Sequence, residues 1–197
     1  MGYSELPGNL AGSKTGDLGS TKVDIAVDGL PPVLGEPQLK RIVHIIREVA
    51  HGPLSYADLM SGGRGATGSE QTCLYLAQYQ AKSGHRVTCY LPTDHPGFHE
   101  GIELLDVRTA WPRLRRADGA DVVISWYTAD PLRVANPRSV RVCSVQINDW
   151  ILNGFGYEQF VDVFVAASES HRRWLMAEPG NPGESARWAI IPNGTGL

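Results

Sequence analysis

The sequence predicts an α/β fold in which a mostly parallel sheet is covered by helices on both faces. Two short, continuous apolar runs, at 42–46 and 121–125, are typical of strands that are buried on both sides. Segments with helical spacing, such as 67–83, alternate with further runs of this kind along the chain. The length of 197 residues, with 42% apolar and 20% charged side chains, suits one globular domain. We therefore expect a Rossmann-like, doubly wound sheet.

The first part of the chain, 1–39, differs from the rest in composition. It is rich in Gly, Pro, Ser and Asp and has few large apolar side chains. Such a segment buries too little apolar surface to offset the entropy lost on ordering. We expect a disordered or loosely attached tail, in which 23–27 could form a short edge strand, and a folded domain over 40–197.

From 40 onward the elements can be assigned in order. A long loop over 48–66 is expected to follow the first strand, and a helix capped by Thr67 or Ser69 then runs to Ser83, with Gly84 as its stop. A short helix is expected at 112–117, a helical turn at 130–134, and a helix capped by Ser168 up to 177. The expected strands are 42–46, 86–91, 102–107, 121–125, 140–147, 162–167 and 187–191.

Composition excludes several classes of function. The net charge is -3, and no broad basic excess supports nucleic-acid binding. The three cysteines, Cys73, Cys89 and Cys143, are scattered and odd in number, which predicts free thiols in a cytoplasmic protein. We expect no transmembrane segment, while peripheral contact with a membrane stays open. The histidines lack metal-ligand spacing, so no metal is expected.

A glycine-rich run opens the long helix and is the first candidate site. Glycines let the backbone approach a ligand closely, and the amides of a helix N-terminus suit a phosphate. The spacing Gly63-x-Gly65-x-x-Gly68 also matches a dinucleotide fingerprint, although about 16 residues separate it from the first strand. The residues of this predicted phosphate loop are Gly62, Gly63, Gly65, Gly68, Ser69 and Glu70.

Ligands of parallel sheets bind beyond the carboxyl ends of the strands. Aromatic residues after the strand at 121–125 could stack on a sugar ring, or one of them could pack under the neighbouring helix. A polar pair beside an aromatic residue after the strand at 140–147 suits hydroxyl recognition. The residues predicted to contact an acceptor are Trp126, Tyr127, Asn148, Asp149 and Trp150.

The chain resembles the N-terminal half of GT-B glycosyltransferases, most like glycosyltransferase family 4, over roughly 40–197. The resemblance rests on Gly68-Ser69-Glu70 at the helix opening, Gly84-His85-Arg86-Val87-Thr88 at the next strand, and Ile190-Ile191-Pro192-Asn193-Gly194. The chain departs from that family at Thr67, where a glycine is usual. It also lacks the histidine that often follows the strand at 121–125.

This resemblance implies an acceptor-side domain of a hexosyltransferase that uses a nucleotide sugar as co-substrate and needs no other cofactor. The expected partners are a nucleotide-sugar donor and a carbohydrate or lipid-linked acceptor. The donor-binding second domain would be absent or supplied by a partner chain, and the isolated chain would not turn over. The resemblance also implies cleft-facing residues at Ser168, Glu169 and Arg172 and a hinge at Pro192, Asn193 and Gly194.

Two alternatives remain at this point. The first is an NAD(P)-dependent Rossmann reductase, although no Tyr-x-x-x-Lys pair is present. The second is a non-catalytic half-transferase module that pairs with a separate donor-domain chain.

Overall fold

The computed structural model describes residues 38–49, 52–61, 66–146, 157–177 and 182–192. These residues belong to one compact unit, which spans 37–197. The predicted tail, including the edge strand expected at 23–27, lies outside the described residues.

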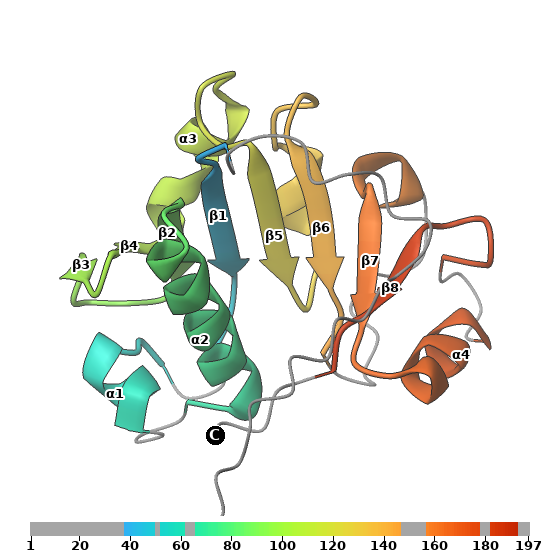
Figure 1. Ribbon diagram of the computed structural model, residues 1–197, viewed down its shortest axis with the longest axis horizontal. Coiled ribbons are helices and arrows are strands. Elements are labelled where there is room, and N and C mark those ends of the chain that lie inside the picture. The colour runs from blue at the N-terminus through green and yellow to red at the C-terminus, as the bar shows by residue number, and fades with distance from the viewer. Residues whose placement is uncertain (1–37, 50–51, 62–65, 147–156, 178–181, 193–197) are drawn as a thin grey trace, which may run out of the picture. The chain divides into compact units, whose positions relative to one another are not determined.

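An eight-stranded sheet forms the centre of the domain, in the order β3-β4-β2-β1-β5-β6-β7-β8 (Figure 1). All neighbouring strands are parallel except β3 and β4, which are antiparallel. The mostly parallel α/β fold predicted from the sequence is therefore confirmed. The strands are β1 (Arg41–Ile46), β2 (Arg86–Leu91), β3 (Gly97–His99), β4 (Ile102–Asp106), β5 (Val122–Trp126), β6 (Val140–Ser144), β7 (Val163–Ala166) and β8 (Trp188–Ile190).

Helices cover both faces of the sheet, as the alternating pattern requires. The α2 helix (Gly68–Lys82) crosses the face nearer the viewer in Figure 1, and buries Cys73, Leu74 and Ala77 there. The opposite face packs against α3 (Ala110–Arg115) and α4 (Glu169–Ala177), which bury Leu114 and Leu175. Single 3-10 turns complete this layer: η1 (Val107–Thr109), η2 (Asp130–Arg133) and η3 (Tyr157–Phe160).

The α2 helix begins and ends close to where its sequence predicts. Thr67 is its N-cap and forms a capping box with Glu70. Gly84 follows the C-terminus at φ 92°, a left-handed conformation that strongly favours glycine. Both ends of the helix are therefore fixed by local sequence.

Besides the 3-10 turns η1 and η3, one helix and one strand were missing from the sequence-based assignment. The loop expected over 48–66 contains a short helix, α1 (Tyr56–Ser61), whose start is capped by Ser55: the backbone N–H of Asp58 donates to the Ser55 hydroxyl over 3.1 Å. Leu59 anchors this helix in the core at 1% exposure. The edge strand β3 was also missed, because its three residues are too few to show an alternating pattern.

Candidate functional site

The strand order places a topological switch point between β1 and β5. The chain leaves β1 for β2 on one side, and leaves β5 for β6 on the other, so the loops that follow these neighbouring strands diverge. In open α/β sheets, ligands bind in the crevice that such diverging loops leave. The N-terminus of α2 and the residues directly after β5 meet at this point of the carboxyl edge, as their contacts show.

Glu70 lies in the first turn of α2 and is the central carboxylate of this site. Its side chain is 3% exposed. The backbone N–H of Thr67 donates to Glu70 Oε2 over 2.8 Å, and the Thr67 hydroxyl donates to the same oxygen. The other oxygen, Oε1, accepts from the Tyr127 hydroxyl over 3.2 Å. A buried carboxylate needs such donors, and their positions fix its orientation.

Tyr127, the first residue after β5, has an unusual backbone conformation. Its φ is 68°, in the left-handed region that a bulky side chain rarely adopts. The N–H of Thr128 donates to the carbonyl of Trp126 over 2.9 Å, which closes a γ-turn around Tyr127. The Tyr127 N–H donates to the carbonyl of Ser144 on β6 over 3.0 Å. This turn directs the phenol toward the start of α2 instead of into the sheet's core.

The phenol of Tyr127 remains a hydrogen-bond donor at neutral pH. Burial raises its pKa to about 12, although the nearby Ser69 and Thr67 hydroxyls act in the opposite direction. Its hydroxyl oxygen also lies 3.4 Å from the Thr67 hydroxyl. Thr67, Glu70 and Tyr127 therefore form one hydrogen-bonded group that joins α2 to the end of β5.

Trp126 does not offer the exposed aromatic face that we expected for sugar stacking. Its side chain is 2% exposed and packs in the core on the α2 side of the sheet. The indole N–H donates to Nδ1 of His44 on β1 over 3.2 Å. His44 is itself fully buried, and its Nε2 lies 2.7 Å from Oε1 of Gln80 on α2. Trp126 is therefore a core residue next to the site. Of the two aromatic residues, only Tyr127 reaches the carboxyl edge of the sheet.

An ion pair that sequence reasoning missed lies after the same two strands. Nη1 of Arg47, which follows β1, lies 2.8 Å from Oδ2 of Asp130 at the start of η2. Both side chains are partly exposed, at 46% and 36%. The sequence could have indicated this pair, because Arg47 follows β1 directly and Asp130 lies four positions after the end of β5.

The cleft-facing residues expected after β7 have mainly local contacts. The backbone N–H of His171 donates to the Ser168 hydroxyl over 3.0 Å, which caps α4 as predicted. Nε of Arg172 donates to Glu169 Oε2 over 3.1 Å along the helix surface. The side-chain nitrogen His171 Nε2 is buried without a hydrogen-bond partner, whereas Nδ1 accepts from the N–H of Ala167 over 3.2 Å.

Of the remaining predicted site residues, the structure describes three. Gly68 and Ser69 open α2 beside Glu70, and Pro192 is exposed after β8. The others, Gly62, Gly63, Gly65, Asn148, Asp149, Trp150, Asn193 and Gly194, lie outside the described residues.

The described residues also bear on thiols, metals and membranes. All three cysteines are free and buried, as predicted, and burial raises the pKa of Cys143 to about 12, so its thiol is a poor nucleophile.

Within the described ranges, no three His, Cys, Asp or Glu side chains gather in a way that could hold a metal ion. The helices in those ranges include none long and apolar enough to cross a membrane.

The sequence matches no known family model and no curated protein.

Proposed function

We propose that this chain carries the acceptor-side domain of a GT-B type, family 4-like glycosyltransferase. The proposal combines the resemblance of the Gly68-Ser69-Glu70 opening and the 84–88 segment with the position of that opening at the switch point. The free, buried thiols are consistent with a reducing cytoplasm.

The single observation that carries the proposal is the contact between Glu70 and Tyr127. A carboxylate at 3% exposure is costly to bury, and a left-handed tyrosine costs on the order of 1–3 kcal/mol. Such costs are found mostly where function requires the geometry. Here both occur together, at the position where the fold favours ligand binding.

The chemistry of this group suits hydroxyl recognition. The Glu70 carboxylate can accept from a sugar hydroxyl, and the Tyr127 hydroxyl can donate or accept. The N–H groups of Gly68 and Ser69, in the first turn of α2, have no carbonyl partner within the helix, and they carry its positive dipole end. They would stabilise a phosphate of the nucleotide-sugar co-substrate. Charge on the departing diphosphate would be stabilised mainly by groups of a donor-binding domain.

The test is release of nucleoside diphosphate by the protein expressed from its complete reading frame. UDP- and GDP-sugars are incubated with the protein and a mixture of candidate acceptors, and free UDP or GDP is quantified. We expect release from one donor class. The isosteric Glu70→Gln variant should reduce the rate by about tenfold or more, since a charged hydrogen bond to the substrate is weakened.

Glu184→Gln provides a matched control, since this glutamate is exposed in the turn before β8, at the amino edge of the sheet. It should leave the rate nearly unchanged. Titration with NADH and NADPH, followed by fluorescence, tests the dinucleotide alternative. Tight binding of either, together with no diphosphate release from any donor, would overturn the proposal in favour of a reductase.

A further inference from the structure

A second surface with binding character lies on the sheet face that α3 covers. Phe98 on the edge strand β3 is 74% exposed. It pairs with Glu103 on β4, so both side chains project from the same face of the sheet. An exposed aromatic ring therefore stands directly beside a carboxylate.

Glu103 belongs to a chain of polar contacts that leads toward α3. Its Oε2 accepts from the Thr88 hydroxyl over 2.9 Å and from Nη1 of Arg113 over 2.8 Å. Neither bond uses the lone pairs of Oε1. A guanidinium has five N–H donors; the bond to Glu103 uses a donor of Nη1, and Arg113 also has a side-chain hydrogen bond with Tyr90. The contacts with Arg113 and Thr88 hold the pKa of Glu103 below its usual value despite the opposing effect of burial.

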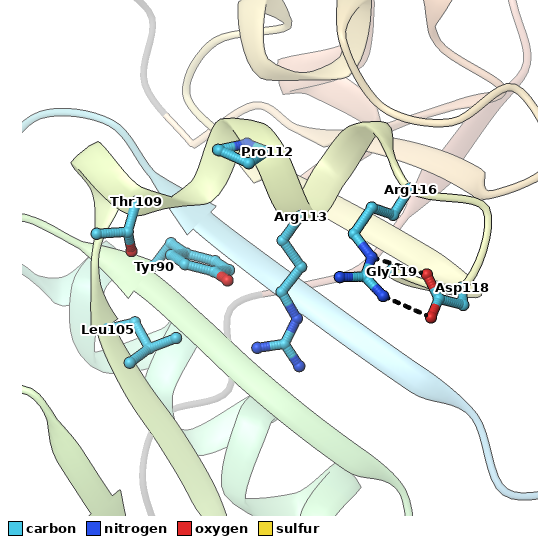
Figure 2. Close-up of a pocket in the computed structure, with 8 residues that line it drawn as sticks. All are labelled: Tyr90, Leu105, Thr109, Pro112, Arg113, Arg116, Asp118 and Gly119. Atoms are coloured by element: carbon cyan, nitrogen blue, oxygen red, sulfur yellow. Dashed lines mark hydrogen bonds and ion pairs between the residues drawn. The ribbon is translucent and has the colours of Figure 1, made fainter.

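Arg113 also borders a cavity of about 550 Å³ between α3 and the strands β2 and β4. Figure 2 shows Arg113 reaching down from α3 toward the sheet, Arg116 just after the end of the helix, and Tyr90 and Leu105 contributed by the sheet. Tyr90 closes the floor at 2% exposure. Arg116 and Asp118 also line the cavity and form an ion pair, in which Nε lies 3.0 Å from Oδ1. The volume is in the range of small-molecule sites.

We propose that this surface, formed by Phe98, Glu103, Arg113 and the adjoining cavity, binds a neutral saccharide. The Phe98 ring offers an apolar face for the C–H groups of a sugar ring. The carboxylates of Glu103 and Asp118 offer acceptors, and the guanidinium groups of Arg113 and Arg116 offer donors. Donors and acceptors that lie side by side in this way match neighbouring hydroxyl groups of a sugar.

The charge balance selects a neutral ligand over an ion. Each arginine of the surface is already paired with one carboxylate, Arg113 with Glu103 and Arg116 with Asp118. Sugar hydroxyls can add to the remaining donors and lone pairs without breaking these pairs. Because the two pairs carry no net charge in sum, they give an anion or a cation no net electrostatic attraction that would offset its loss of hydration.

The test is a titration of the ¹⁵N-labelled protein with maltotriose and cellotriose, followed in ¹H–¹⁵N spectra. We expect amide shifts concentrated in β3, β4 and α3 with at least one of them. Phe98→Ala should weaken binding by at least about fivefold, and Arg113→Gln by about tenfold. Both positions are partly or largely exposed, so the variants should keep the fold.

Two matched variants control for the type of substitution. Tyr79→Ala removes an aromatic ring that is 71% exposed on α2, and Arg115→Gln removes an exposed arginine of α3 that does not line the cavity. Neither should change the affinity, and Glu70→Gln should not either, which separates this surface from the carboxyl-edge site. The proposal is overturned if neither saccharide shifts these amides, if Phe98→Ala leaves the affinity unchanged, or if phenyl phosphate or L-phenylalanine binds there instead.

Discussion

At the scale of single residues, His44 connects the core to the candidate site. An indole N–H can only donate, so the bond from Trp126 makes His44 Nδ1 an acceptor and places the proton of the neutral ring on Nε2. Nε2 then donates to Oε1 of Gln80 over 2.7 Å. The neutral ring thus satisfies a partner on β5 and another on α2. A second proton on Nδ1 would face the indole N–H and break the first bond.

This arrangement predicts a specific loss of stability in acid. Burial lowers the pKa of His44 from 6.5 to about 4, although the bond to Gln80 acts in the opposite direction. Because the folded-state pKa is the lower one, the stabilisation is present above pH 6.5 and is lost as the pH falls toward 4. Between these limits the free energy of unfolding should fall by about 3 kcal/mol from this group.

Urea unfolding at about pH 7 and about pH 4 measures the effect. The His44→Gln variant has no titrating ring, so it should lose about 3 kcal/mol less than the wild type over this range. Other titrating groups contribute equally to both proteins and cancel in the comparison. Equal losses in the two proteins would mean that His44 is protonated within the fold.

At the residue scale, the sequence alone could not predict which of two adjacent side chains faces the site. Trp126 and Tyr127 are adjacent aromatic residues, and the sequence did not show which would face the edge. The choice depends on the γ-turn, whose bonds come from Thr128 and from Ser144 on another strand. Glu70 could be placed at the helix start from local pattern alone, because capping is a local interaction.

At the scale of elements, the same kind of Arg–Asp contact joins the amino ends of two pairs of neighbouring strands. Asp121, just before β5, accepts from the backbone N–H of Arg41 on β1 over 2.8 Å and from its guanidinium over 2.9 Å. Asp162, just before β7, does the same with Arg141 on β6, at 2.7 and 3.0 Å. The amino edge is therefore fixed by these pairs, while the opposite edge carries the site.

Removing one such charge should destabilise the domain. Asp121→Asn is expected to lower the free energy of unfolding by about 1 kcal/mol, a discounted value because the carboxyl is 34% exposed. Its pKa is lowered to about 2, mainly by the hydrogen bonds from Arg41, so this contribution is present above pH 3.8 and lost toward pH 2.

Denaturant unfolding at neutral pH measures this change. The control is Asp118→Asn, which removes a carboxylate from a pair that is 65% exposed or more on both sides and should have little effect. Equal destabilisation by the two variants would argue against a special role of the Arg41–Asp121 pair. The comparison holds the charge change constant and varies only the contacts.

At the scale of the whole molecule, periodicity predicted the parallel strands well. The helix α2 and the strand β2 were placed almost to the residue, because a capping motif, Gly84 and a clear apolar run mark their limits. The short elements α1 and β3 were not predicted, since their burial depends on neighbours distant in sequence. Strand order also had to come from the structure, because periodicity does not specify which strands are neighbours.

That order predicts how protection from hydrogen exchange is distributed. β1 lies between β2 and β5, its last five residues are buried, and its neighbours are buried in turn. β8 is the terminal strand, and its three residues are all partly or fully exposed. Opening β8 exposes little apolar surface, whereas opening β1 requires loss of most of the core.

Exchange measured by mass spectrometry on peptic peptides should therefore show a gradient across the sheet. Amides of β1 and β5 should exchange last, with free energies close to that of global unfolding, and those of β8 and β3 should exchange first. The site would then join a rigid strand end at Tyr127 to the start of α2. Protection of β8 equal to that of β1 would contradict this, and would mean that the sheet opens only as a single cooperative unit.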